Sequence, residues 1–338
     1  MNKPSRKILV TGVAGFLGSH LAEKLSELNH EVIGIDNMSG GYEDNVSKKI
    51  KFFNFDCCNF QKMNEVMKSV EVVYHCAATA HEGLSVFSPV EITKNNYMAS
   101  VSVFTAAIAN KVKRIIFCSS MARYGDQKIP FTEDMSPKPI DPYAISKVAA
   151  ENVLINLCEL NKIEWVIAVP HNIIGPRQKY DDPYRNVASI MINLMLDGRQ
   201  PIIYGNGEQK RCFSFYSDDI DILKILASDN NVNGEVINIG PDNEFITINE
   251  LAETLAKLLN FKLDPIYMPG RPKEVLLANC SAEKVKKMLG YHPKVSLKDG
   301  LSEMIEYIQD RGIKKFKYHL DLEIISELTP DTWKNKIF

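Results

Sequence analysis

Short apolar runs rich in β-branched residues alternate with amphipathic segments through the first half of the chain. The runs predict strands at Lys7–Val10, Glu31–Asp36, Ile50–Asp56, Val70–Ala77, Arg114–Ser120 and Glu164–Pro170. Between the first two runs, Leu17, Leu21, Leu25 and Leu28 recur at helical spacing, so this segment can cover one face of a sheet. Such alternation is typical of an α/β fold with a doubly wound parallel sheet.

After about residue 171 the pattern loosens into loops punctuated by glycine and proline, with short predicted strands at Pro201–Gly205 and Val236–Gly240. The chain has 338 residues, and a single core stops growing at about 250–300 residues. We therefore predict two lobes, one spanning residues 1–171 and a smaller α/β substrate-binding lobe spanning 172–338. The charged and apolar segment from Lys314 is expected to dock onto the body of the protein.

Composition limits the classes of ligand. The 40 basic and 42 acidic residues give a formal charge of −2, so no general field attracts nucleic acid or an anionic membrane. Met1–Arg6 is polar and has no apolar signal core, and no apolar run reaches the about 20 residues of a membrane span. The seven cysteines form no metal-ligand spacing. We expect a cytoplasmic protein with reduced thiols, no metal and a small-molecule ligand.

A glycine-rich turn follows the first predicted strand. Gly12, Gly15 and Gly18 leave this strand and open the helix, where bare backbone amides and the helix N-terminus can hold a pyrophosphate. Asp36 ends the second predicted strand, where a carboxylate accepts the ribose hydroxyls of NAD and repels the extra phosphate of NADP. The segment predicts an NAD site; the alternative is an ordinary turn with a solvated aspartate.

A tyrosine and a lysine lie one helical turn apart after Pro142. Tyr143 and Lys147 then point the same way, and a nearby ammonium favours the phenolate, whose ordinary pKa is about 10. Ser119 and Ser120 end the preceding predicted strand. This pattern predicts that Tyr143 acts as a general base, although an amphipathic helix could also simply begin here.

Further motifs occur in one order along nearly the whole chain: His75–Ala78, Asn96, Ser119–Gly125, Asp141–Tyr143, His171-Asn172, Gly175–Arg177 and Arg271-Pro272. With them the sequence resembles the extended short-chain dehydrogenase/reductases, and among these the nucleotide-sugar epimerases and dehydratases. The resemblance implies a Rossmann-like domain to which part of 215–250 returns. It also implies a homodimer formed through helices near Asn96–Asn110 and Ala144–Leu160.

The resemblance also implies roles for individual residues. Cofactor binding falls to Gly12, Gly15, Phe16, Leu17, Gly18, Asp36, Asn37, Asp56, Cys57, Ala77, Ala78, Asn96, Ser119, Tyr143 and Lys147. Catalysis falls to Ser120, Tyr143 and Lys147. Substrate binding falls to Ser120, Tyr143, Asn172, Val187, Tyr204, Arg211, Arg271, Glu274 and Ala278. The arginines and Asn172 would serve the diphosphate, Tyr204 the nucleobase and Glu274 the nucleoside ribose.

Departures from the family pattern narrow the expected reaction. Met121 and Ala122 stand where the related 4,6-dehydratases carry an acid pair, so acid–base elimination of water is disfavoured. We predict C4 epimerisation of a UDP-hexose or UDP-N-acetylhexosamine, with the small Ala278 leaving room for an N-acetyl group. A 4-ketosugar reductase, a sugar dehydrogenase and a non-catalytic NAD sensor are the alternatives. His81-Glu82 either lines the sugar pocket or forms a solvated turn.

Overall fold

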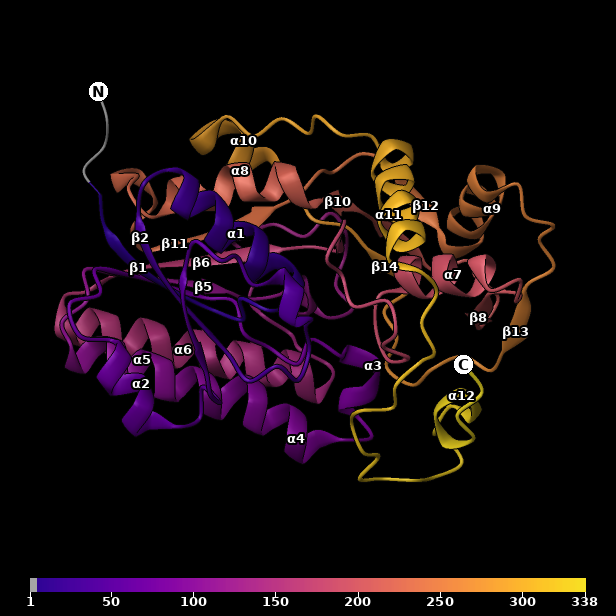
Figure 1. The fold of residues 1–338 in the computed structure, drawn as a ribbon, viewed down its shortest axis with the longest axis horizontal. Coiled ribbons are helices and arrows are strands. Elements are labelled where there is room, and N and C mark those ends of the chain that lie inside the picture. Colours follow the sequence, from indigo (N-terminus) through magenta and orange to yellow (C-terminus); the bar gives the residue numbers. More distant parts are fainter. Residues whose placement is uncertain (1–4) are drawn as a thin grey trace.

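A seven-stranded parallel sheet organises the first lobe of the computed structural model, which describes residues 5–338 (Figure 1). The strands lie in the order β11-β6-β5-β4-β1-β2-β3. Their bounds are Lys7–Thr11 for β1, Glu31–Asp36 for β2, Lys51–Asn54 for β3, Val72–His75 for β4, Arg114–Cys118 for β5, Glu164–Pro170 for β6 and Glu235–Ile239 for β11. The order reverses between β1 and β4, and ligands bind at such a switch point in doubly wound folds.

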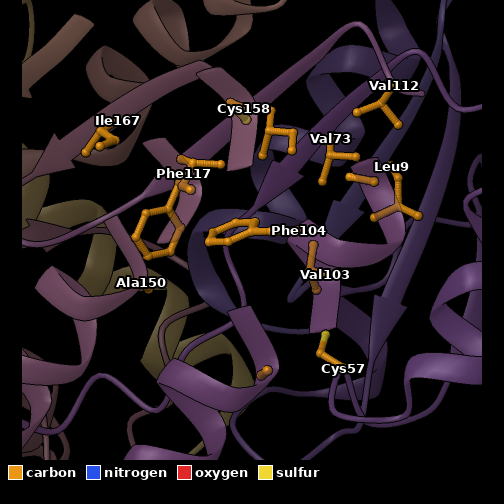
Figure 2. Close-up of a cluster of buried hydrophobic side chains, with 14 of the residues drawn as sticks. Leu9, Cys57, Val73, Val103, Phe104, Val112, Phe117, Ala150, Cys158 and Ile167 are labelled. Atoms are coloured by element: carbon orange, nitrogen blue, oxygen red, sulfur yellow. The ribbon is translucent and has the colours of Figure 1, made fainter. Parts of the chain in front are cut away.

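Helices cover both faces of this sheet because successive strand residues point to opposite sides. One face carries α1 (Phe16–Glu27), α8 (Tyr216–Leu226) and α10 (Glu283–Leu289). The other carries α2 (Phe60–Val66), α5 (Ala99–Ala109) and α6 (Pro142–Asn161). Figure 2 shows the core beneath α5 and α6, where strand side chains such as Val73 and Phe117 meet Phe104.

Several predicted strands end earlier than expected, and the early ends of β4 and β5 bear on the functional site. The run Val70–Ala77 narrows to β4, because the N–H groups of Cys76 and Ala77 donate to Thr11 Oγ1 at 3.1 and 3.0 Å instead of to a neighbouring strand. Arg114–Ser120 likewise ends at Cys118, and Met121–Tyr124 forms a 3-10 turn. Because β4 and β5 end early, the residues that follow them turn toward the functional site.

The second lobe is built from short sheets and three longer helices. In its sheets, β9 pairs with β12 and β14, β13 pairs with β8, and β10 pairs with β7. The strands are Ile173–Ile174 (β7), Ile202–Tyr204 (β8), Lys210–Cys212 (β9), Ser214–Phe215 (β10), Phe245–Thr247 (β12), Ile266–Met268 (β13) and Leu277–Ala278 (β14). The helices α7 (Val187–Leu196), α9 (Ile248–Leu259) and α11 (Leu297–Arg311) share one apolar cluster.

The predicted strand at Val236–Gly240 does not belong to this second lobe. It forms β11, which pairs in parallel with β6 and extends the main sheet. Ile237 and Ile239 are fully buried in the apolar cluster that α8 shares with α1. Burial on the sheet, which the local pattern alone does not reveal, therefore returns residues 216–239 to the first lobe.

The segment after α11 crosses from the second lobe to the first and back (Figure 1). Near α3 (Glu82–Ser85) and α4 (Pro89–Thr93), Ser88 Oγ donates to the carbonyl of Asp321 at 2.6 Å. The Glu323 carboxylate accepts from the N–H groups of Val90 and Glu91, both at 2.8 Å. The segment ends with α12 (Asp331–Lys334), whose Trp333 is buried. No helix among residues 5–338 is long and apolar enough to cross a membrane.

Candidate active site

A cavity of about 450 Å³ lies at the carboxyl ends of the sheet strands and continues into the second lobe. It is lined from the first lobe by the glycine turn and the ends of β2, β4 and β5, and from the second lobe by α7 and β8–β9. Its size falls in the range of about 300–1,000 Å³ that is typical of small-molecule sites. The cavity brings most of the residues assigned from sequence into one space.

The glycine turn fits a dinucleotide because backbone packs directly against backbone. Gly12 has φ +79°, and a Cβ there would lie 2.9 Å from the backbone nitrogen of Ala77. A Cβ on Gly18 would lie 2.2 Å from the carbonyl oxygen of Gly12, so α1 approaches the turn closely. Gly15 is the N-cap of α1. Free amides at this helix N-terminus can therefore reach a pyrophosphate without intervening side chains.

The carboxylate of Asp36 is held at the end of β2. It accepts from the N–H of Met38 at 2.7 Å and from the N–H of Ala14 at 3.0 Å. Burial raises the pKa of Asp36, while these hydrogen bonds oppose the rise. Asn37, Asp56 and Cys57 also line the cavity, with Asn37 Nδ2 donating to Asp56 at 3.1 Å. This end suits the ribose and adenine of the cofactor.

Asn96 does not line the cavity, although the sequence assigned it to cofactor binding. It is 1% exposed and bonds both backbone groups of Thr79, at 3.1 Å through Oδ1 and 3.0 Å through Nδ2. Asn95 and Thr79 line the cavity in its place. Asn96 is a positioning residue that fixes the loop after β4, because its amide is bonded to that loop and, at 2.8 Å, to the carbonyl of Ile92 in α4.

Ser120, Tyr143 and Lys147 meet beside this cavity. Tyr143 and Lys147 lie one turn apart near the start of α6, which Asp141 caps by accepting from the N–H of Ala144 at 2.9 Å. The Ser120 hydroxyl accepts from the N–H of Ala122 at 3.2 Å and lies close enough to the Tyr143 phenol to lower its pKa. Lys147 Nζ donates to the carbonyl of Cys118 at 2.8 Å. Burial lowers the pKa of Lys147 to about 8.

The pKa of Tyr143 is raised in the structure, whereas the sequence predicted that Lys147 lowers it. Burial is the main cause of the rise, the negative charge of Glu82 adds to it, and the Ser120 hydroxyl opposes it. Lys147 is not among the groups that shift this pKa, because its ammonium is directed to the Cys118 carbonyl at the end of β5. A bound nicotinamide ring would add a positive charge that favours the phenolate.

Glu82 and Arg185 bring unassigned charges to the same cavity. The Glu82 side chain is exposed to the cavity, and protein surrounds it on its other sides. Removal from bulk water is the main reason that its pKa rises to about 7, and the negative charge of Asp141 adds to the rise. Arg185 lines the cavity near Tyr143 and forms no hydrogen bond or ion pair with any residue in 5–338. His81-Glu82 therefore lines the pocket, as one of the two sequence interpretations held. Arg185 carried no local sequence signal.

The second lobe gathers the predicted nucleotide-binding side chains. Arg211 lies on β9, and Arg271 and Glu274 lie on the loop before β14. Arg271 Nη2 donates to Glu274 Oε1 at 2.7 Å, and the Arg271 guanidinium stacks 4.8 Å above the Tyr204 ring. Arg211 Nη2 lies 3.9 Å from the same carboxylate oxygen. Two guanidinium groups thus face one cavity, with Glu274 beside them and Glu82 close enough to act on both, and paired guanidinium groups suit a diphosphate.

Asn172 and Val187 line the cavity, but Ala278 does not. Asn172 has φ +43° and donates to the Cys212 carbonyl at 3.0 Å. Val187 is the first residue of α7. Ala278 is 7% exposed, pairs with Arg211 across β14 and β9, and packs in the apolar cluster of the sheet. The structure favours the ordinary core role for Ala278, because its side chain faces the core and not the sugar pocket.

The returning C-terminal segment supplies cavity residues that the sequence did not indicate. His319, Leu320 and Phe338 line the cavity. The Thr332 hydroxyl is hydrogen-bonded to the Tyr204 hydroxyl, and Trp333 Nε1 donates to the carbonyl of Pro183 at 3.1 Å. The only signal in the sequence was a mixture of apolar and charged residues, which predicts docking but not where the segment docks.

A glycine-rich turn at the switch point of a parallel sheet, in one cavity with a buried tyrosine, is the arrangement of the extended short-chain dehydrogenase/reductases, and the fold and site define this class. The chain belongs to the NAD dependent epimerase/dehydratase family, whose profile matches residues 8–240. Its cofactor is accordingly NAD.

Relatives within this family carry out more than one reaction. A UDP-N-acetyl-alpha-D-glucosaminuronate decarboxylase of Bacillus cytotoxicus is 32% identical over 320 residues, covering 90% of this chain and 98% of the relative. A putative UDP-glucose 4-epimerase of Methanocaldococcus jannaschii is 33% identical over 312 residues, covering 90% and 99%. The crystal structure of UDP-glucuronic acid 4-epimerase from Bacillus cereus, in complex with UDP-glucuronic acid and NAD, matches with a TM-score of 0.84 at 29% identity, covering 90% of this chain and 100% of that chain.

Proposed function

We propose that the protein is an epimerase that inverts C4 of a UDP-hexose or UDP-N-acetylhexosamine through a transient 4-ketone. The observation that carries the proposal is the position of Tyr143, beside Ser120, in a cavity that joins the glycine turn to the arginines of the second lobe. A nucleotide sugar bound by its diphosphate at Arg211 and Arg271 extends its sugar toward Tyr143.

The chain's own residues then move the proton and hold the sugar. Tyr143 takes the proton of the C4 hydroxyl, directly or through Ser120, and returns it after inversion. NAD⁺, when bound, accepts the C4 hydride and gives it back to the opposite face of the ketone. Asp36 and the glycine turn retain the cofactor, which is not consumed over one cycle. Lys147, bonded to the Cys118 carbonyl, places a positive charge at the end of the cavity that holds Tyr143.

Dehydration is disfavoured by the residues that follow Ser120. Met121 is 7% exposed and Asn172 Nδ2 lies 3.5 Å from its sulfur, so the 3-10 turn offers a thioether where acid–base chemistry would need a carboxyl. Ala122 has no functional group. Glu82 brings one carboxyl into the cavity from another element, but elimination of water requires an acid and a base at neighbouring carbons.

A UDP-linked uronic sugar is the second candidate substrate, and Arg185 is the observation that favours it. Its guanidinium lines the cavity near Tyr143 and has no ion-pair partner within residues 5–338. Guanidinium groups bind carboxylates in a planar, bidentate geometry. Oxidation of such a sugar at C4 would give a β-keto acid, which can either be reduced to the C4 epimer or lose carbon dioxide. The negative charge of Glu82 would repel the carboxylate of a uronic sugar and so disfavours this candidate.

A homodimer through α5 and α6 remains part of the proposal. Both helices contain small apolar residues, and Met98 and Ile145 beside them are 52% and 53% exposed. Apolar side chains of this size on neighbouring helices suit an interface between two copies.

The test is a panel of UDP-sugars incubated with purified protein and no added NAD, with products identified by NMR. The proposal predicts conversion of a neutral UDP-hexose or UDP-N-acetylhexosamine to an equilibrium mixture of C4 epimers. Turnover of UDP-glucuronic acid alone would support the second candidate. Stoichiometric conversion only with added NAD(H) would contradict epimerisation and indicate a net oxidoreductase.

A further inference from the structure

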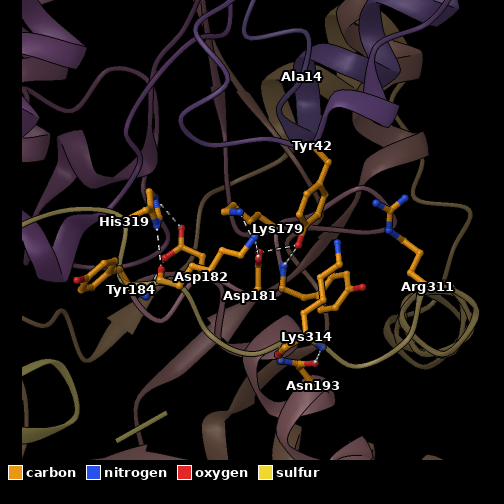
Figure 3. A network of polar contacts seen from close by, with 12 residues as sticks. Ala14, Tyr42, Lys179, Asp181, Asp182, Tyr184, Asn193, Arg311, Lys314 and His319 are labelled. Carbon is orange, nitrogen blue, oxygen red and sulfur yellow. Dashed lines mark hydrogen bonds and ion pairs between the residues drawn. The ribbon is translucent and has the colours of Figure 1, made fainter. Parts of the chain in front are cut away.

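Three side chains from distant parts of the chain converge at the edge of the cavity. His81 follows β4, Asp182 lies before α7 and His319 lies on the C-terminal segment. One ligand atom from each falls within 4.8 Å of the other two. His81 Nε2 lies 2.9 Å and His319 Nε2 lies 3.9 Å from the same oxygen, Asp182 Oδ2. Figure 3 shows His319 and Asp182 directed toward each other beside Tyr184.

We propose that His81, Asp182 and His319 form a binding site for a divalent transition-metal ion of the Zn²⁺ type. Two imidazoles and one carboxylate are a donor set that Zn²⁺ accepts, with bonds of about 2.0–2.2 Å. Tetrahedral ligands at that distance lie roughly 3.3 Å from one another. The 2.9 and 3.9 Å separations straddle this value, and the two histidine ligand atoms lie within 4.8 Å of each other, so binding a metal would require these side chains to draw together around it.

The hydrogen bonds around His319 and Asp182 orient a lone pair of each toward one point, whereas His81 Nδ1 is buried and has no hydrogen-bond partner within residues 5–338. His319 Nδ1 lies 3.1 Å from the carbonyl oxygen of Lys317, which can only accept, so the ring proton belongs on Nδ1 and Nε2 carries a lone pair. The other oxygen of Asp182 accepts from the N–H of Tyr184 at 2.9 Å. A carbonyl behind a histidine and a donor behind a carboxylate are the outer partners that metal ligands use.

When His319 is neutral and no cation is bound, the contact between His319 and Asp182 sets one lone pair against another. The proton in the His81–Asp182 bond satisfies one pair, and the 3.9 Å contact is too long for a second hydrogen bond. Both His81 and Asp182 are nearly fully buried, at 3% and 1% exposure, so water does not readily replace a partner here. The positive charge of Arg185 opposes binding of a metal ion here, because Arg185 lies close enough to His81 to act on its imidazole.

All three residues line the cavity, so a metal held by them would keep a fourth position open to it. It would also join the two lobes to the C-terminal segment at one point, because His81 belongs to the first lobe, Asp182 to the second and His319 to that segment. A sugar oxygen or a water molecule is the ligand class that fits the open position. Metal binding would therefore link docking of the C-terminal segment to binding of a sugar in the cavity.

The experiment uses full-length protein, free of any affinity tag, treated with EDTA and dialysed. Titration with ZnCl₂ by calorimetry and with CoCl₂ by visible absorption should each give one equivalent per chain, with the Co²⁺ bands expected of a four- or five-coordinate ion. His319→Ala and Asp182→Asn should each weaken binding by more than the about 10–100-fold that loss of an outer partner costs. His292→Ala is the matched control, because His292 is exposed and outside the cluster.

A thermal measurement covers the case in which a variant folds poorly. Zn²⁺ bound only to the native state should raise the melting temperature of the wild-type protein and of His292→Ala, but not that of His319→Ala. The proposal is overturned if the wild-type chain binds neither ion stoichiometrically. The three side chains would then have a structural role only. It is also overturned if His319→Ala binds as tightly as the control.

Discussion

Tyr143 is buried next to a carboxyl group, and both features hold its pKa above the ordinary value. A base in this state depends on the groups that oppose the rise, which are the Ser120 hydroxyl and the Arg185 guanidinium. Stabilisation of the Tyr143 phenolate therefore depends more on the positive charge of the cofactor than the spacing of Tyr143 and Lys147 suggested.

Tyr143→Phe removes the general base and keeps the ring that packs in the site. We expect turnover to fall by about 10²–10⁴-fold, the usual contribution of general acid–base catalysis, with the bound NAD content unchanged. Steady-state rates and dinucleotide release measure the two quantities. Tyr267→Phe is the control, because Tyr267 is 52% exposed and outside the cavity; comparable rates for the two variants would refute the role of Tyr143.

Glu82→Gln tests the carboxyl that faces the tyrosine. The charge of Glu82 raises the pKa of Tyr143, so its removal should lower that pKa and move the acid limb of the kcat profile to lower pH. The difference should be largest above about pH 7, where the Glu82 carboxyl is ionised. Glu65→Gln on the exposed face of α2 should leave the limb in place. A shift to higher pH would mean that Glu82 itself supplies the base.

At the level of elements, the turn between β1 and α1 is the least tolerant part of the cofactor cleft. Gly18→Ala sets a methyl group 2.2 Å from the Gly12 carbonyl oxygen, so backbone must move. We expect a loss of about 1–3 kcal/mol in the free energy of unfolding, as for other overpacked sites, and loss of retained NAD. Chemical denaturation and dinucleotide release are the measurements.

Gly40→Ala provides the comparison within the same cavity, which Gly40 also lines, because nothing lies within 4 Å of a Cβ at Gly40 and its φ is not positive. This variant should keep the wild-type stability and its NAD. If both glycine variants behaved alike, close packing of α1 on the turn would not be what holds the cofactor.

How far the sequence predicted these elements depended on how local their causes are. Glycines 12, 15 and 18 and the pair Tyr143 and Lys147 act over one turn, so spacing alone located them. Ala278 was assigned by its distance from Arg271 along the chain, but the pairing of β14 with β9 turns it into the core. His319 reaches the cavity only through tertiary contacts of the C-terminal segment, which leave no periodic pattern.

Across the whole molecule, the two lobes are joined beside the cofactor cleft by Tyr42. Its hydroxyl donates to Asp181 at 2.7 Å and Lys314 lies 3.7 Å above its ring, as Figure 3 shows. Its backbone N–H donates to the carbonyl of Ala14 in the glycine turn at 3.1 Å. The loop that follows Asp36 is thus fixed to the second lobe, and release of a bound dinucleotide would require these contacts to open.

Purified protein should therefore carry NAD(H) without any being added. Denaturation and filtration should release dinucleotide in near-equal amount to the protein, detected by absorbance and an enzymatic cycling assay. Tyr42→Ala should speed its loss on dialysis, because the variant removes the hydroxyl and ring contacts to the second lobe. Cofactor that exchanges freely in the wild-type protein would favour a net oxidoreductase.

The fate of the hydrogen at C4 tests the central claim most directly. A UDP-sugar substrate identified in the panel would be prepared with deuterium at C4 and incubated with the protein in ordinary water containing excess unlabelled NADH. Epimerisation through a retained cofactor predicts a C4 epimer that keeps its deuterium at C4, as read by NMR and mass spectrometry. An epimer that has exchanged its deuterium for hydrogen from the added NADH or from water would contradict the account.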